Sequence, residues 1–269
     1  SELIQVASFL KEKYGSTMIQ ALRTVLPVKT KMKPKEEVFI TLSIEKDAAQ
    51  QLLCEWERKH FAARARFLST LLKKERMRKE EAVKACNFPL KELRKLSEQG
   101  IIKLESRIKY RNPFPELVTR KQGWPLNDEQ RAIVDNFKEE YRKGERRTYL
   151  LYGITGSGKT EVYLSLINEV LTAGRQVIVL IPEISLTYQT LMRFYRHFGD
   201  RVSVMNSTLS ESEKSDQFER ARRGEIDVII GPRSALFTPF PRIGAIIMDE
   251  EHESSYKNES MPKYHTREV

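Results

Sequence analysis

The sequence predicts two fold classes in one chain, an α+β module followed by an α/β lobe built on a parallel sheet. From residue 147 onward, short runs rich in Val, Ile and Leu alternate with helical patterns. Such runs are typical of parallel strands covered by helices on both faces. Before residue 120, helical periodicity dominates and one alternating strand follows it. Proline-containing stretches at 28–37 and 111–125 are typical of linkers.

These breaks predict three parts. Residues 1–35 form an N-terminal helical segment and linker, 36–118 the α+β module, and 119–269 the α/β lobe. The 269 residues, 40% of them hydrophobic, suffice for two packed cores.

Composition excludes several protein classes. No apolar run approaches the roughly 18 residues of a membrane helix, and the first residues lack the pattern of a signal peptide. We therefore expect a cytoplasmic protein with no membrane partner. Cys54 and Cys86 form no C-x-x-C pair, so the sequence supports neither a disulfide framework nor a zinc cluster.

Charge is divided unevenly along the chain. Residues 1–120 contain 26 Lys and Arg against 15 Asp and Glu, whereas 121–269 contain 21 against 22, giving net charges of +11 and −1. This asymmetry indicates a module that faces a polyanion. A solvated helical surface rich in Lys and Glu would give the same imbalance.

The first module has the pattern of a winged helix-turn-helix. Residues 47–74 are helical in periodicity, two short helices follow on either side of a turn at 87–89, and 101–110 reads as a strand or small hairpin. Helix 90–99 takes the place of the recognition helix. Winged helices also bind proteins, but this one offers phosphate-contacting side chains at Lys91, Arg94 and Lys95 on that helix and at Arg107 on the wing.

The segment LLYGITGSGKTEVYLSLI, residues 150–167, contains the phosphate-binding pattern G-x-x-x-x-G-K-[ST]. An apolar strand pattern at 147–153 precedes it and a helical pattern follows, as the motif requires. Lys159 is expected to reach the β and γ phosphates of a nucleotide and Thr160 to hold Mg²⁺. The loop itself is expected to cradle the phosphates with backbone N–H groups, from Gly153, Thr155, Gly156, Ser157 and Gly158.

A second motif lies at the end of the apolar strand IIMDEEH, where Asp249 and Glu250 are adjacent. Asp249 is expected to orient Mg²⁺ and Glu250 to polarise an attacking water. Alone, the motif could be a solvated acidic strand end, but the phosphate loop upstream favours the catalytic interpretation. Gln130, before the loop, could pair with adenine through its amide.

Together these motifs resemble the superfamily 2 DExH helicases, and most closely the primosomal replication-restart helicases. The resemblance rests on GITGSGKTEVY, on IPEISLTYQ at 181–189, on GPRSALFTPF at 231–240, and on DEEHESSYK with YHTREV at 249–269. It covers almost all of 121–269. It implies a RecA-like helicase lobe that uses ATP and Mg²⁺, preceded by a winged helix.

The resemblance also implies residue roles. His252 would couple hydrolysis to DNA, and the turns around Ser185, Arg233 and Ser234 would contact a strand. Either turn could instead be a strand-to-helix cap. Tyr256 and Lys257 fall in the aromatic-rich loop with which the family senses single-stranded DNA, although Tyr256 could simply pack on a neighbour.

Several departures from the family pattern accompany this resemblance. The loop after the third strand reads VMNSTLS, with Asn206 and Thr208 where the family commonly has histidine and glycine, and no function is assigned to it. The second motor lobe, its arginine motif, the zinc-binding cysteines expected in the full-length family and the domain that binds a 3′ end have no counterpart in this sequence. The chain therefore resembles a central fragment, with weak or no hydrolysis expected.

The resemblance implies 3′ to 5′ unwinding at stalled or abandoned forks, followed by reloading of the replicative helicase. Implied partners are forked and single-stranded DNA, other primosome proteins and the single-stranded-DNA-binding protein. A different class stays open, a winged-helix DNA-binding regulator whose P-loop lobe is a nucleotide switch. A motor should bind DNA with steep salt dependence and little base preference.

Overall fold

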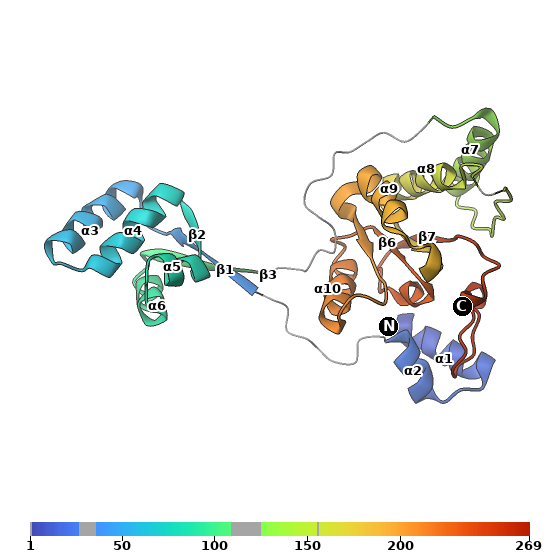
Figure 1. Cartoon of the computed structure of the whole chain (residues 1–269), viewed down its shortest axis with the longest axis horizontal. Helices are drawn as coiled ribbons and strands as arrows, with labels where there is room; N and C mark the ends of the chain where they lie inside the picture. Colours follow the sequence, from blue (N-terminus) through green and yellow to red (C-terminus); the bar gives the residue numbers. More distant parts are fainter. Residues whose placement is uncertain (1, 27–35, 109–124, 155) are drawn as a thin grey trace. The chain divides into compact units, whose positions relative to one another are not determined.

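The computed structural model describes residues 2–26, 36–108, 125–154 and 156–269. Within them the chain divides into two compact units (Figure 1). The smaller unit contains residues 36–108, and the larger contains residues 2–26 together with 125–269. None of the described helices is long and apolar enough to cross a membrane.

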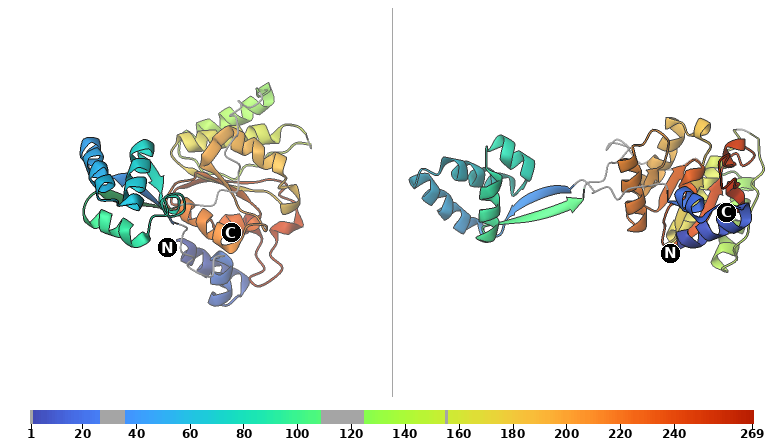
Figure 2. Two further views of the ribbon diagram at one scale, coloured as in Figure 1. Left: turned by 60° about the vertical axis from the view of Figure 1, so that its left-hand side comes forward. Right: turned by 90° about the horizontal axis from the view of Figure 1, so that it is seen from below.

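The smaller unit places four helices beside a three-stranded sheet. In chain order these are β1 (Glu36–Leu42), α3 (Lys46–Arg58), α4 (Ala62–Lys74), β2 (Arg76–Arg78), α5 (Lys79–Ala85), α6 (Leu90–Glu98) and β3 (Ile102–Ile108). The antiparallel sheet has the order β2-β1-β3. Figure 2 shows β1 and β3 side by side as a two-stranded ribbon.

The core of this unit forms between the helices and the base of the sheet. Phe67 of α4 stacks on Phe88 with ring centroids 4.4 Å apart, and Leu93 and Leu96 bury one face of α6. Burial of one apolar face is the main source of stability for a helix this short. Leucines on that face leave the opposite face of α6 to charged residues.

Two details of this unit differ from the sequence expectation. The helical run at 47–74 is two helices, α3 and α4, broken by a turn where His60 has a φ of 57°. Within segment 101–110, the described residues 102–108 form the strand alternative rather than a hairpin, because β3 pairs with β1 from the start of the module. Residues 28–37 are predicted as a linker and β1 is not predicted, since its ladder partners lie far along the sequence, β2 at residues 76–78 and β3 at residues 102–108.

The larger unit is an α/β lobe. Its main elements are α1 (Glu2–Tyr14), α2 (Met18–Val25), α7 (Asp128–Arg142), α8 (Lys159–Thr172), β4 (Gln176–Leu180), α9 (Tyr188–Phe198), β5 (Val202–Val204), α10 (Glu211–Arg222), β6 (Val228–Gly231) and β7 (Ile243–Met248). Short 3₁₀ turns lie at Glu183–Ser185, Gly199–Arg201, Arg233–Phe237, Ser254–Tyr256 and Thr266–Glu268.

The four strands of the lobe are parallel, in the order β5-β6-β4-β7. Helices α8 and α9 cover one face and α10 the other (Figure 1). Strands β4, β5 and β6 are buried throughout, which explains their continuous Val and Ile sequences. The arrangement is a RecA-like α/β lobe, and it brings the carboxyl ends of all four strands to one edge, where ligands bind in such sheets.

The expectation of a strand at 147–153 is wrong, because no strand forms there. Tyr149 instead turns toward α7, where its ring lies 5.6 Å from that of Phe137 and its hydroxyl donates to Glu140. Leu150 and Tyr152 are 77% and 93% exposed. These contacts hold the segment on α7, and β7 keeps a partly exposed edge.

The N-terminal helices belong to the lobe. Thr17 and Gln20 form a capping box that starts α2, and the apolar faces of α1 and α2 pack against residues close to the other end of the sequence. Their core cluster contains Ala7, Leu10, Ala21, Val25, Phe237 and Tyr264.

Candidate nucleotide-binding and strand-binding site

The phosphate loop enters α8 with the backbone that the motif requires. Gly156 and Gly158 have φ values of 84° and 83°, a left-handed conformation that glycine adopts without a Cβ clash. The first N–H groups of α8 have no acceptor within the helix and can face an anion. Thr160 lies in this first turn beside Lys159, whereas Thr155 lies outside the described residues.

Lys159 folds back onto its own loop. Its Nζ donates to the carbonyl oxygens of Gly153 at 2.8 Å and Ile154 at 3.2 Å. These carbonyls hold the ammonium at the mouth of the loop, where phosphate oxygens could replace them as partners. The loop, the lysine and the helix terminus therefore fit a nucleoside triphosphate.

Gln130 contacts the phosphate loop directly. Its Nε2 donates to the Ser157 carbonyl at 2.9 Å, while its Oε1 accepts the Asn127 N–H at the start of α7. A Cβ at Gly158 would come within 2.5 Å of the Gln130 Nε2, so the close approach requires glycine. In this structure, Gln130 buttresses the loop.

The acidic strand end lies beside the phosphate loop. Asp249 follows β7, and its Oδ1 accepts hydrogen bonds from the Tyr163 hydroxyl at 3.2 Å and from the Glu250 N–H at 3.1 Å. Burial raises the pKa of Asp249, and the Lys159 charge opposes that shift. The Tyr163 hydroxyl thus joins the acidic strand end to α8, the helix that follows the phosphate loop.

Tyr163 is a site residue that sequence reasoning missed. It is only 8% exposed, and its pKa is raised, first by burial and then by the charge of Asp249. Its position in the sequence could have indicated this role. Tyr163 lies four residues after Lys159, and residues four apart share one face of a helix. Its hydroxyl fixes one carboxylate oxygen of Asp249 and leaves the other for a cation.

Glu250 and His252 follow on a tight turn. Glu250 has a φ of 46°, a conformation that costs energy for a residue with a Cβ and is common at functional sites. The His252 Nε2 lies 3.8 Å from the Glu250 Oε2. The turn places His252 beside Glu250, which directly follows Asp249.

The expected strand-binding turns also lie at this edge. Ser185 follows β4, and Arg233 and Ser234 follow β6. All three side chains are half-buried. The Arg233 guanidinium donates to the carbonyls of Ser255 and Lys257, so it ties its turn to the next loop.

Tyr256 requires a correction, because its ring is 1% exposed and is not placed to stack on a base. Its hydroxyl donates to the carbonyls of Asp249 at 2.7 Å and Leu180 at 2.9 Å. It therefore takes the packing alternative and bridges the ends of β7 and β4. Lys257, by contrast, is exposed.

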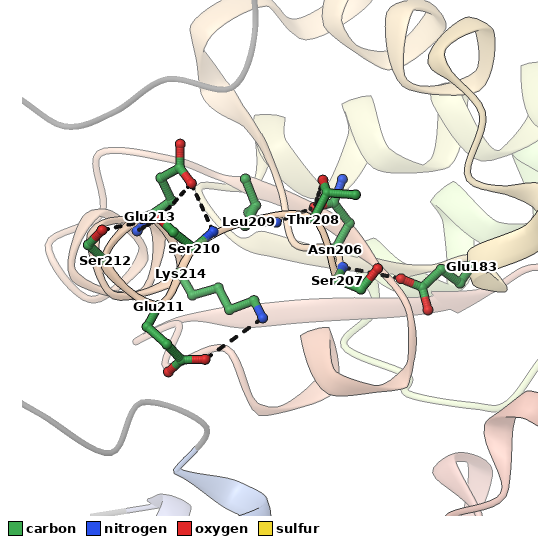
Figure 3. A network of polar contacts seen from close by, with 10 residues as sticks. All are labelled: Glu183, Asn206, Ser207, Thr208, Leu209, Ser210, Glu211, Ser212, Glu213 and Lys214. Atoms are coloured by element: carbon green, nitrogen blue, oxygen red, sulfur yellow. Dashed lines mark hydrogen bonds and ion pairs between the residues drawn. The ribbon is translucent and has the colours of Figure 1, made fainter.

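The loop after β5 is fastened to the neighbouring turn (Figure 3). The Glu183 carboxylate accepts the Ser207 N–H at 3.1 Å, and the Asn206 Oδ1 accepts the Leu209 N–H and the Thr208 hydroxyl. Ser210 then caps α10 in a capping box with Glu213. Asn206 and Thr208, which depart from the family pattern, thus make local hydrogen bonds within this loop.

In the smaller unit, Lys91, Arg94 and Lys95 lie on the exposed face of α6. Glu92, on the same helix, accepts from Arg64 and lies 3.2 Å from Lys95. Arg107 lies in β3 opposite Glu37, and its side chain falls outside the described part of the chain.

Many protein metal sites are built from three or more His, Cys, Asp or Glu side chains. Across the described ranges, no three His, Cys, Asp or Glu side chains converge to form a metal site. The expected Mg²⁺ ligands Thr160 and Asp249 stay a prediction, of the kind in which the protein shares the ion with nucleotide phosphates.

Comparison with known proteins gives one family match and a consistent set of relatives. Residues 124–267 match the family described as type III restriction enzyme, res subunit. The replication restart protein PriA of Bacillus subtilis is 47% identical over 178 residues, which are 66% of this chain and 22% of that protein. PriA of Chlamydia muridarum is 35% identical over 282 residues, which span 100% of this chain and 36% of the relative.

PriA of Haemophilus influenzae is 50% identical over 121 residues, covering 45% of this chain and 17% of that protein. The chain thus spans roughly a third or less of these relatives, between 17% and 36%. The family match covers more than half of the chain and includes the phosphate loop and the acidic strand end. The chain therefore belongs to the type III restriction enzyme res subunit family, and it is similar along its length to replication restart proteins PriA.

Proposed function

We propose that this chain is the ATP- and DNA-binding part of a replication-restart helicase. The observation that carries the proposal is that the phosphate loop, with Lys159 and Gln130, leads into α8, which contacts the acidic strand end through the Tyr163–Asp249 hydrogen bond. The names of its relatives support replication restart as the process. They do not favour the nucleotide-switch regulator.

Each residue at the edge has a proposed task. Lys159 and the N–H groups of the loop neutralise and orient the triphosphate, and Gln130 supports the loop and pairs with adenine. Thr160 and Asp249 hold Mg²⁺, which supplies charge neutralisation when it is bound. Glu250 orients water, and His252 links this step to DNA.

The DNA contacts are proposed on both units. The exposed cations of α6, with Arg107 on the ribbon, contact phosphates as a winged helix does. Ser185, Ser234 and the exposed Lys257 grip a single strand without reading its bases. Arg233 contributes by fixing the loop that carries Lys257.

For the whole protein we propose 3′ to 5′ unwinding of forked DNA in the cytoplasm and reloading of the replicative helicase. Other primosome proteins and the single-stranded-DNA-binding protein are the proposed partners. The division of the sequence at 1–35, 36–118 and 119–269 is part of this proposal, with the middle part as the DNA-binding winged helix and the described helices of the first part packed on the lobe.

The test is Mg·ATP binding and hydrolysis by this chain with and without forked DNA. Lys159→Ala should lose nucleotide binding, because it removes the charge that meets the phosphates. Lys143→Ala, a cation in a surface pair with Glu139 on the same lobe, is the matched control. Binding that persists in Lys159→Ala would overturn the nucleotide site, whereas slow turnover with intact binding is expected.

A further inference from the structure

The helical pair α1–α2 lies against the segment that follows the acidic strand end. Leu10 and Ala21 are fully buried in one cluster with Phe237 and Tyr264, which are each 2% exposed. The rings of Phe237 and Tyr264 meet edge to face at 5.7 Å. The cluster thus joins the start of the chain to both the β6 turn and the last residues.

A polar contact fixes the same junction. The Tyr14 hydroxyl donates to the Glu268 Oε2 at 2.6 Å, and the Lys13 Nζ lies 3.4 Å from that oxygen. Glu268 belongs to the short 3₁₀ turn Thr266–Glu268. One carboxylate therefore anchors the end of the segment to the last turn of α1.

From that turn, hydrogen bonds lead to the candidate nucleotide site. The Thr266 hydroxyl donates to the Tyr256 carbonyl at 2.8 Å, and the Tyr256 hydroxyl donates to the carbonyls of Asp249 and Leu180. Asn258 closes the segment on itself, because its N–H donates to the Tyr264 carbonyl at 2.8 Å. The path is continuous from Tyr14 to the backbone of Asp249.

The segment also touches the strand-binding side. Arg233 donates to the carbonyls of Ser255 and Lys257, so a shift of residues 253–268 would move the β6 turn and the exposed Lys257 together. The segment therefore contacts residues of both candidate sites, and α1–α2 packs against it at Tyr264.

We propose that α1–α2 is a positioning element, which holds segment 253–268 through Tyr14 and thereby sets the coupling between strand binding and nucleotide binding. The coupling rests on the proposed function. Coupling free energy requires an element that both ligands bias, and this segment contacts both sites. Tyr14 itself touches neither ligand, so it acts through Glu268.

Hydrogen exchange of the backbone amides tests the positioning without any ligand. In Tyr14→Phe, the amides of Tyr256, Asn258 and Tyr264 should exchange several-fold faster, because the anchor of their segment is lost. The amides of β4 and β6 should be unchanged. Tyr149→Phe is the matched control, because its hydroxyl also donates to a glutamate of the same lobe. Glu268→Gln retains an acceptor and should behave as wild type, whereas Glu268→Ala should reproduce Tyr14→Phe.

The coupling is measured as the ratio of single-stranded DNA affinities with and without a Mg·ATP analogue. In Tyr14→Phe each separate affinity should stay within about twofold, while that ratio falls several-fold toward one, as expected when only linkage is lost. A merely structural role would lower the melting temperature and leave the ratio intact, which would overturn the proposal. Unchanged exchange, or wild-type protein that binds both ligands without coupling, would also overturn it. Failure of the wild-type chain to bind the nucleotide would instead overturn the proposed function, and the coupling with it.

Discussion

At the scale of single residues, Gln130 serves two structures at once. The amide oxygen completes the capping box of α7, and the amide nitrogen supports the phosphate loop. Gln130→Glu separates these tasks, because glutamate can still accept the Asn127 N–H but cannot donate to Ser157. The carboxylate would face a carbonyl oxygen.

We expect Gln130→Glu to weaken binding of a fluorescent ATP analogue by about tenfold or more, or about 1.4 kcal/mol for each lost polar contact, because the donor to Ser157 and the proposed donor to adenine are both lost. The melting temperature should change little, whereas Gln130→Ala should lower both because it also removes the cap. Equal nucleotide affinities for wild type and Gln130→Glu would show that the contact with Ser157 does not support the loop.

Tyr14 makes the stability of the lobe sensitive to alkaline pH. Burial and the hydrogen bond to Glu268 raise the pKa of Tyr14 from 10.0 to about 12. A pKa raised by folding means that the protonated phenol stabilises the fold below pH 10.0, and that this contribution is lost as pH rises toward about 12.

The free energy of unfolding of wild type should therefore exceed that of Tyr14→Phe at neutral pH, and the difference should shrink as pH rises through this window. Urea unfolding of both proteins across the window gives the difference, in which the contributions of the other tyrosines cancel. A constant difference would show that the hydroxyl does not titrate as part of this contact.

At the scale of elements, the helices and strands of the lobe were predicted correctly where the pattern that indicates them lies within one short segment of the sequence. The glycines and Lys159 gave the start of α8, and continuous apolar runs gave β4, β6 and β7. Prediction failed where the outcome depends on distant partners. Strand β1 exists because of β3, segment 147–153 is held by Phe137 and Glu140 on α7, and Tyr256 is buried by the strand ends it bridges.

Strand β7 depends on a glycine for its fit against the helices. A Cβ at Gly244 would lie 2.5 Å from Arg175 Cβ and Val170 Cγ1 and 2.6 Å from the Tyr141 hydroxyl. Gly244→Ala should therefore destabilise the fold by about 1–3 kcal/mol through overpacking. Ile246→Val, on the half-exposed side of the same strand, should stay within about 0.5 kcal/mol. Denaturant unfolding compares the two, and similar stabilities would mean that α8 moves away at little cost.

At the scale of the whole molecule, the excess of positive charge and the candidate nucleotide site lie in different parts of the sequence. The excess of positive charge lies in residues 1–120, while the nucleotide site lies in the nearly neutral remainder. Such a division separates long-range attraction of DNA from the chemistry at the sheet edge. Affinity for DNA and affinity for nucleotide should therefore respond to different sets of mutations.

The exposed cations of α6 test this division. Replacing Lys91, Arg94 and Lys95 by alanine should reduce the slope of log affinity against log salt by about 2 to 3, since each lost phosphate contact removes about 0.9. The control replaces Lys46, Lys59 and Lys74, cations of the same unit that lie outside α6 and pair with Glu75, Glu55 and Glu81. Both triple variants change the net charge equally, so a purely nonlocal attraction would lower both slopes alike. Only contact at α6 makes the slope of the α6 variant fall further than that of the control. Fluorescence anisotropy with a forked DNA over a range of salt concentrations distinguishes contact at α6 from nonlocal attraction.

Nucleotide affinity should remain that of wild type in both variants, because neither set of cations lies in the nucleotide-binding lobe.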